Sequence, residues 1–158
     1  MPTLTVESNG MIERTAVYYN GVQLARVKEL YVYIDENGAF DALIQYIGTD
    51  KQEYTKQIFT DTLTNIITTE PSFTEEEASL LQNLSIESEG NVEDTYIYLN
   101  DEELEGIISM LLHIKVNKNK TGILSFIGKS SRFSDEIMCK SEITFRNEDD
   151  SESTERIF

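Results

Sequence analysis

The chain has 158 residues, with 29 Asp and Glu against 13 Lys and Arg, and a net charge of −16 at pH 7. This length favours one domain, and a hydrophobic content of 39% excludes a wholly disordered chain. The single cysteine excludes an intrachain disulfide. No apolar run approaches the roughly 20 residues that cross a bilayer, and the first residues lack a signal-peptide pattern, so we expect a cytoplasmic protein.

The charge is distributed unevenly along the chain. Residues 57–114 contain 13 acids and no Lys or Arg, whereas residues 115–146 carry more bases than acids. A fold that gathered the central acids on one surface would repel nucleic acid there and would attract a basic partner.

The first third of the chain predicts antiparallel sheet with two hairpins. Asn20-Gly21 and Asn37-Gly38 follow strand-like runs, and Asn-Gly is a strong hairpin signal because a type I′ turn needs positive φ at both central residues. The alternation of apolar residues changes phase near Arg26, which predicts a bend, a bulge or two short strands there. The strand over residues 39–47 places one set of apolar side chains on a single face: Phe40, Ala42, Ile44 and Tyr46.

The middle of the chain predicts helices. Apolar spacing indicates a helix over residues 61–68. Thr74, with Glu77 three residues later, is a capping box that opens a second short helix. Residues 92–99 indicate a strand, after which Asn100 caps the most regular helix. The apolar stripe of that helix is Leu104, Ile107, Ile108, Leu111 and Leu112.

The last third returns to strands, predicted over residues 122–127 and 137–146. Residues 147–158 are polar and acidic, which predicts a flexible C-terminal tail. We identify no internal repeat. The order of elements predicts an α+β fold, with mostly antiparallel sheet and two or three short helices inserted in the middle of the chain, as a single domain over residues 1–146.

The central acids are the leading candidate site. Six of them fall in the first turns of predicted helices, where a carboxylate stabilises the helix dipole by about 0.3–1 kcal/mol. That role does not explain the absence of compensating bases, so we interpret the segment as an acidic face that binds a basic protein surface. One version is a phage or mobile-element inhibitor that mimics nucleic acid charge. The predicted partner-binding residues are Glu75, Glu76, Glu77, Glu87, Glu89, Glu93, Asp94, Asp101, Glu102 and Glu105.

Catalytic constellations are not evident in the sequence. The chain has one histidine, His113, and one cysteine, Cys139, which cannot form a Cys/His zinc set. Cys139 is expected on the apolar side of a strand, where a thiol is usually inert. We therefore predict no enzymatic activity, no metal site and no cofactor.

The alternative function is binding of single-stranded nucleic acid. A basic island and the sheet aromatics would supply phosphate contacts and stacking platforms. The basic residues are Lys115, Lys118, Lys120, Lys129 and Arg132. Glu148-Asp149-Asp150 and the final Ile157-Phe158 resemble the acidic tip of bacterial and phage single-stranded-DNA-binding proteins, which implies a tail that recruits partners and competes with DNA. A further alternative is a structural or assembly protein built around the hairpin-rich first third.

Overall fold

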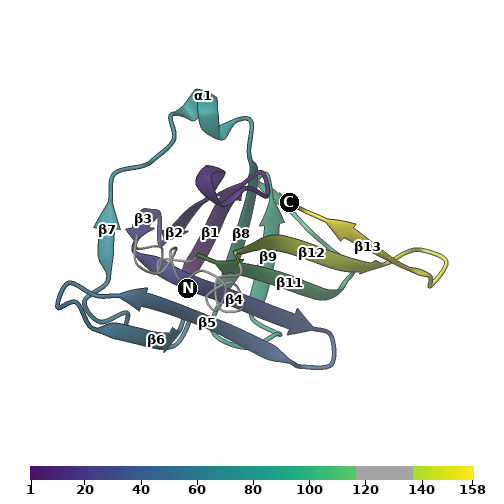
Figure 1. Cartoon of the computed structure of the whole chain (residues 1–158). Coiled ribbons are helices and arrows are strands. Elements are labelled where there is room, and N and C mark those ends of the chain that lie inside the picture. Colours follow the sequence, from purple (N-terminus) through teal and green to yellow (C-terminus); the bar gives the residue numbers. More distant parts are fainter. Residues whose placement is uncertain (117–136) are drawn as a thin grey trace, which may run out of the picture.

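The computed structural model describes residues 1–116 and 137–158. Two antiparallel sheets pack against each other, and Figure 1 shows the strands of one sheet crossing those of the other. The seven-stranded sheet has the order β10-β9-β8-β1-β2-β3-β7, and the six-stranded sheet has the order β13-β12-β11-β4-β5-β6. The first sheet contains β1 (Thr3–Ser8), β2 (Ala16–Tyr19), β3 (Val22–Ala25), β7 (Ile67–Thr69), β8 (Gln82–Ser88), β9 (Thr95–Leu99) and β10 (Glu102–Glu103). The second contains β4 (Val27–Asp35), β5 (Phe40–Ile47), β6 (Glu53–Gln57), β11 (Ile107–Lys115), β12 (Met138–Arg146) and β13 (Glu152–Arg156).

The core lies between the two sheets because apolar side chains alternate along the central strands. Leu4 and Val6 on β1 are fully buried between half-buried neighbours, and Leu30 and Val32 repeat this pattern on β4. Such alternation gives each strand one apolar and one polar face, which suits a sheet that packs on one side only. Neighbouring strands complete the core with Ile44, Tyr46, Leu84, Ile86, Met110, Leu112 and Ile143.

Two of the three helices predicted in the middle of the chain are wrong, and the fold is nearly all β rather than α+β. Residues 61–66 form turns and irregular backbone, and β7 follows them beside β3. The helix predicted from Asn100 is instead the β9–β10 turn followed by β11. Pairing of β11 with β4 on one side and β12 on the other outweighs the local helical spacing.

Two helical pieces occur among the described residues, the 3-10 turn η1 (Ile12–Arg14) and α1 (Glu75–Ala78). The capping box at Thr74 is confirmed, but the helix that it opens has only four residues. Neither helical piece has the length and apolar character needed to cross a bilayer.

The predicted hairpins and the change of phase at Arg26 are confirmed. Asn20-Gly21 joins β2 to β3, and Asn37-Gly38 joins β4 to β5. Arg26, with a φ of 59°, separates β3 in one sheet from β4 in the other. The strand predicted over residues 137–146 is β12, whereas the strand predicted over residues 122–127 lies outside the described residues.

The chain contains an internal repeat, contrary to the expectation from sequence. Strands β1–β6 and β8–β13 occupy equivalent places on the two sides of the sheet centres. Residues 4–34 align with residues 84–114 without a gap, and ten of these 31 positions are identical. The identities are Leu4/Leu84, Glu7/Glu87, Ser8/Ser88, Gly10/Gly90, Glu13/Glu93, Thr15/Thr95, Tyr18/Tyr98, Asn20/Asn100, Leu24/Leu104 and Ile34/Ile114. We name residues 4–59 the first repeat and residues 84–158 the second repeat.

The two repeats face each other across an approximate two-fold axis. In the seven-stranded sheet, Thr5 of β1 lies opposite Ser85 of β8, which is its own equivalent, and their side-chain oxygens are 2.9 Å apart. In the six-stranded sheet, Val32 of β4 lies opposite its equivalent, Leu112 of β11. Each sheet is therefore joined at its centre by one strand from each repeat.

The repeats differ in length at one place. Four residues separate Asp35 from Phe40, whereas 23 residues separate Lys115 from Cys139. Beyond this difference the alignment resumes, because Phe40 of β5 and Cys139 of β12 lie opposite the equivalent residues Ile34 and Ile114. Residues 40–59 then match residues 139–158, and the two repeats end in Ile58-Phe59 and Ile157-Phe158.

Residues 147–158 do not form the flexible acidic tail that the sequence predicted. Residues Glu152–Arg156 form β13, which pairs with β12 as β6 pairs with β5. Ile157 is 9% exposed and Phe158 is 6% exposed, and both belong to the core. The resemblance to a partner-docking tip therefore fails, because Phe158 packs inside the fold.

Candidate functional site

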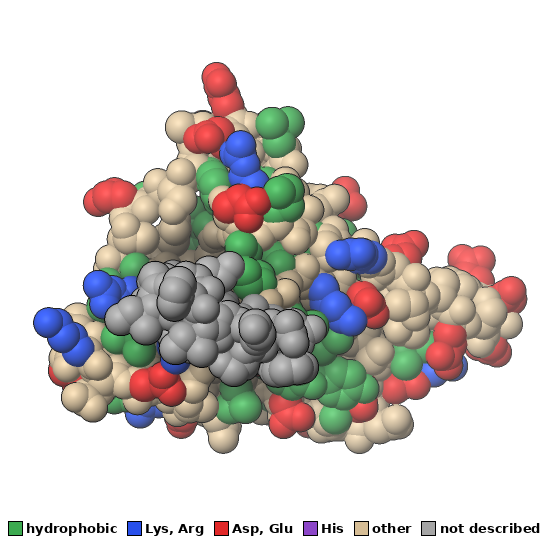
Figure 2. Space-filling model, viewed as in Figure 1, with side chains coloured by type: hydrophobic (Ala, Val, Ile, Leu, Met, Phe, Trp, Pro, Cys, Tyr) green, Lys and Arg blue, Asp and Glu red, His purple; other side chains and the backbone are tan. Residues whose placement is uncertain are grey.

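The ten acids predicted to bind a partner do not form one surface. They lie on α1 (Glu75, Glu76, Glu77), in the β8–β9 loop (Glu89, Glu93, Asp94), around β10 (Asp101, Glu102, Glu105) and on β8 (Glu87). The β8–β9 loop and the β9–β10 turn lie at opposite ends of β8, whose seven residues span roughly 20 Å. Figure 2 shows the acidic group over α1 at the top, and a further acidic group, not among these ten, over the β12–β13 hairpin at the right.

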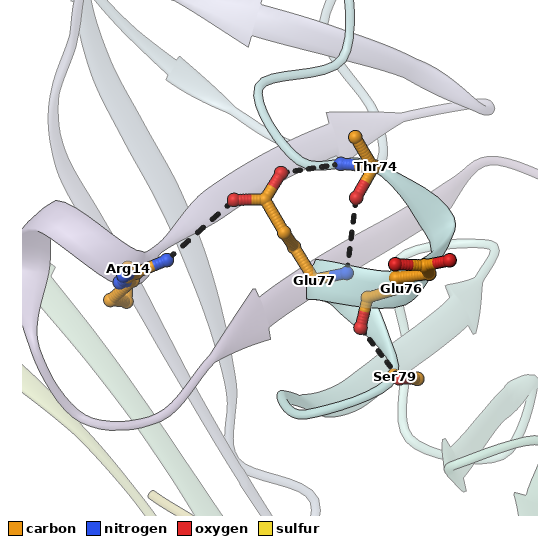
Figure 3. A network of polar contacts seen from close by, with 5 residues as sticks. All are labelled: Arg14, Thr74, Glu76, Glu77 and Ser79. Atoms are coloured by element: carbon orange, nitrogen blue, oxygen red, sulfur yellow. Dashed lines mark hydrogen bonds and ion pairs between the residues drawn. The ribbon is translucent and has the colours of Figure 1, made fainter.

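The acids of α1 serve the helix itself. Glu77 N–H donates to Thr74 Oγ1 at 3.1 Å, and Thr74 N–H donates to Glu77 Oε1 at 3.0 Å (Figure 3). Arg14 Nη1 lies 3.8 Å from Glu77 Oε2. Hydrogen bonds with Thr74 hold the pKa of Glu77 below its usual range. We therefore assign this group to the stability of α1.

Four acids lie on β10 or next to it in the sequence, and β10 is the last strand of the seven-stranded sheet. We call them the acidic edge: Asp101, Glu102, Glu103 and Glu105. All four side chains are exposed, and none forms an ion pair or a side-chain hydrogen bond within the described part of the chain. Glu103 joins the group because β10 stands where a helix was predicted, in which Glu103 would have had only a capping role.

The equivalent strand of the first repeat carries no acid. Positions equivalent to the acidic edge hold Gly21, Val22, Gln23 and Ala25. Strand β3 pairs with β2 in the same register as β10 pairs with β9, since Tyr18 lies opposite Gln23 and Tyr98 lies opposite Glu103. The fold therefore does not require carboxylates at these positions, and their presence on and around β10 needs another cause.

The negative charge of the acidic edge extends across the outer face of β9. Partial burial and the charges of Glu87 and Glu103 raise the pKa of Tyr98. Its equivalent, Tyr18, lies beside Glu7, and burial together with the charge of Glu7 raises the pKa of Tyr18 to about 12. Among the described residues, Glu7 Oε1 is the buried side-chain oxygen that lacks a hydrogen-bond partner.

Two cavities lie at equivalent places in the repeats. One, of about 270 Å³, is lined by apolar residues that include Ile97, Leu104 and Ile107. The other, of about 260 Å³, is lined by their equivalents Val17, Leu24 and Val27. Their polar linings differ: Asp35, Glu36 and Glu103 line the first, and Gln23 and Arg26 line the second. The acidic edge therefore borders the more acidic cavity.

The basic island of the alternative function is only partly described. Lys115 ends β11 and is half-buried. Lys118, Lys120, Lys129 and Arg132 lie outside the described residues, so their role as a nucleic-acid interface stays a prediction.

His113 and Cys139 lie on opposite faces of the six-stranded sheet. Cys139 lies opposite the buried Ile114, whereas His113 points to the outer face and its Nε2 is 2.7 Å from Glu29 Oε2. The thiol of Cys139 lies 3.3 Å from Thr15 Oγ1. Within the described ranges, no three His, Cys, Asp or Glu side chains are grouped so as to hold a metal ion.

Comparisons with protein-family models, with curated proteins and with solved structures find no match for this chain. The two repeats can still be compared with each other, because they share strand order and register. A difference between equivalent positions then separates what the fold requires from what belongs to one repeat.

Proposed function

We propose that this protein is a binding module that recognises a basic surface of another protein through its acidic edge. The observation that carries this proposal is the contrast between the repeats: four carboxylates, two on β10 and one on each side of it in the sequence, stand at positions where the first repeat has none. Exposed like charges that are close together in the chain repel each other in the free protein, and an opposite charge on a partner relieves that repulsion.

Part of the charge of the acidic edge has a simpler explanation, which is protection of the sheet edge against pairing with strands of other chains. Exposed edges are commonly guarded by short strands and by charged side chains that oppose pairing with other chains. Strand β10 has only two residues, so shortness already limits such pairing. Four acids, in a segment with no Lys or Arg among residues 57–114, exceed what protection needs and favour selection of a basic partner.

Binding would begin with long-range attraction and end in exposed ion pairs. Attraction of this kind raises the association rate, and it weakens steeply with salt because the Debye length is only about 10 Å at 0.1 M ionic strength. A partner that normally binds nucleic acid through a basic groove is one candidate, and the protein would then act as a charge mimic and inhibitor.

The test compares two variants that lose the same charge at different places. The edge variant carries Asp101→Asn, Glu102→Gln, Glu103→Gln and Glu105→Gln. The control carries Glu75→Gln, Glu76→Gln, Glu89→Gln and Glu93→Gln, which spares the capping carboxylate of Glu77. Wild type and both variants are used to capture proteins from a cell lysate at low and at high salt.

We expect one basic protein to be retained at low salt by wild type and by the control, and to bind the edge variant about tenfold or more weakly. Equal retention by the edge variant would overturn the proposal. Equal loss from both variants would show an effect of net charge rather than of the acidic edge, and would overturn it as well.

A further inference from the structure

The two ends of the seven-stranded sheet are not equivalent. At one end, β7 from the segment between the repeats pairs antiparallel with β3, and Gln23, Leu24 and Ala25 lie opposite Thr69, Thr68 and Ile67. At the other end, β10 pairs with β9, and no further strand of the described residues lies beside it. Among the described residues of the second repeat, no strand therefore takes the place that β7 takes beside β3.

The side chain of Gln23 secures the segment that follows β7. Its Nε2 donates to Ser72 Oγ at 2.7 Å, and Ser72 N–H donates to Gln23 Oε1 at 2.7 Å. Gln23 is consequently only 7% exposed, whereas the equivalent Glu103 is exposed. A carboxylate only accepts hydrogen bonds, so a segment that docked at Glu103 would have to present donors.

The backbone of β10 has hydrogen-bonding groups that face away from the sheet. Leu104 N–H donates to the carbonyl oxygen of Ile97 on β9 at 2.8 Å. Because successive residues of an antiparallel strand direct these groups to opposite sides, the N–H and C=O groups of Glu103 face the open edge. Continuation of the strand past Leu104, as in β3, would direct those of Glu105 the same way. An incoming strand can pair with them as β7 pairs with β3.

We propose that a basic, extended segment of the partner protein adds to β10 as an antiparallel strand, in the place that β7 takes beside β3. This inference rests on the proposed function and adds the mode of recognition. Strand addition to a free edge draws affinity from main-chain hydrogen bonds and specificity from alternate side chains.

The negative charge of the acidic edge disfavours pairing of β10 with β10 of a second molecule. Self-pairing of β10 would bring the acidic edges of two molecules together, and like charges placed opposite each other destabilise a pair of strands. The edge strands of the other sheet carry both signs, so they select no single charge: β6 contains Glu53 and Lys56, and β13 contains Glu155 and Arg156.

The register of β7 specifies the side chains of the partner segment. In β7, Thr69 and Ile67 lie opposite Gln23 and Ala25, the equivalents of Glu103 and Glu105. Two residues of the partner segment, separated by one, would therefore lie opposite Glu103 and Glu105, and we expect both to be basic. The partner residue between these two would lie opposite Leu104, and its side chain would point to the same face of the sheet as the side chain of Leu104. Leu104 lines the cavity of about 270 Å³, so we expect an apolar residue at this central position.

The experiment uses a peptide taken from the chain itself. The probe has the sequence of residues 66–73 with Ile67→Lys, Thr68→Val, Thr69→Lys and Glu70→Gln, and the unchanged sequence serves as the first control. A second control is the same substituted peptide with N-methyl groups on the amides of positions 67 and 69, which keeps the charge but removes the donors that face β10. Binding to the full chain is measured by calorimetry at low salt, and contact is located by amide hydrogen exchange.

We expect the substituted peptide to protect the amides of Glu103 and Glu105, and to bind about tenfold or more tightly than its N-methylated form because two hydrogen bonds are lost. The unchanged peptide should bind no more tightly than the N-methylated peptide. Binding should be lost in the variant of the acidic edge described above.

Other outcomes overturn strand addition, and they separate it from the proposed function. If the two substituted peptides bind equally and both are lost in the edge variant, the charge recognition stands and the strand pairing fails. If neither peptide binds, strand addition fails, while capture of a basic protein by wild type and by the control variant still decides the proposed function.

Discussion

Single residues at the two equivalent hairpin turns show what the backbone requires there. Asn20 and Asn100 have φ of 50° and 51°, and Gly21 and Asp101 follow with φ of 85° and 70°. Positive φ at both central residues is the geometry of a type I′ turn, which suits the right-handed twist of the flanking strands. A residue with a Cβ is strained in this conformation, so the second repeat is less favourable at Asp101 than the first is at Gly21.

Exchanging these residues between the repeats should therefore change stability in opposite directions. We expect Asp101→Gly to raise the free energy of unfolding, and Gly21→Asp to lower it, by about 1 kcal/mol each. An added Cβ at Gly21 meets no atom within 4 Å, so the cost there comes from the backbone alone. Urea unfolding of both variants measures the changes, and shifts of the same sign would contradict the equivalence of the two turns.

The raised pKa of Tyr18 makes stability depend on pH in the alkaline range. The pKa is about 12 in the folded chain, mainly through burial and then through the charge of Glu7, against about 10 when unfolded. A group with a raised pKa stabilises the fold fully below its unfolded pKa, and this contribution is lost as pH rises from about 10 to about 12.

We expect the ultraviolet difference titration between wild type and Tyr18→Phe to show a midpoint near the upper end of this range. The variant Glu7→Gln should lower that midpoint without restoring the ordinary pKa, since burial is the larger cause. A wild-type midpoint near the pKa of free tyrosine would refute this account of the site.

At the level of elements, the equivalent strands β6 and β13 are each followed by the same buried pair, Ile-Phe. Ile58-Phe59 follows β6, and Ile157-Phe158 follows β13. Ile157 N–H donates to the carbonyl oxygen of Ser141 at 2.7 Å, as Ile58 N–H donates to that of Ala42 at 2.9 Å. The acids around β13 therefore accompany a strand that is anchored in the core.

Removing the buried ring at the end of the second repeat should strongly destabilise the protein. We expect Phe158→Ala to lower the free energy of unfolding by about 3 kcal/mol or more, as core Phe→Ala changes do. The exposed neighbour Glu155→Ala should change it by less than about 0.5 kcal/mol. Urea unfolding followed by circular dichroism compares the two, and equal, small effects would show that the segment is not anchored.

Local sequence predicted the elements that local chemistry determines. Both Asn-Gly hairpins, the change of phase at Arg26 and the capping box at Thr74 are set by residues within a few positions of each other. Strand β11 was missed because Ile107, Ile108, Leu111 and Leu112 also fit helical spacing, and only pairing with β4 and β12 selects the strand. The repeat was missed because most equivalent positions differ while their burial pattern agrees.

The candidate site was predicted in composition but not in arrangement. The sequence pointed to the acids of residues 57–114, and three of the four residues of the acidic edge were among those named. Which of the ten acids lie together depends on strand order, which brings β8, β9 and β10 side by side and leaves the β8–β9 loop at the far end. Glu103 was not among the predicted partner-binding residues because its carboxylate was assigned to the capping box of a predicted helix.

At the scale of the whole molecule, each repeat depends on the other for its central pairing. Strands β1 and β4 of the first repeat find their inner partners in β8 and β11 of the second. The core is one cluster that draws residues from both repeats. The two repeats should therefore fold together as one cooperative unit.

Separating the repeats should abolish folding of each half and allow recovery when the halves are mixed. We expect fragments 1–79 and 80–158 to lack stable tertiary structure alone, because each exposes the inner edges of its central strands. An equimolar mixture should regain the native circular dichroism and sediment as a one-to-one complex. A fragment that folds and remains monomeric by itself would contradict this interdependence.

Because the two repeats pair with each other along their central strands, the same contacts can form within one chain or between two chains. Two molecules can exchange their second halves through the segment between them and form a dimer with every native strand pairing intact. Closure within one chain proceeds at a local concentration set by that segment, whereas exchange becomes faster as more protein is present. Refolding in dilute solution will thus give single molecules, and refolding in concentrated solution will give a growing share of exchanged dimers that gel filtration can separate.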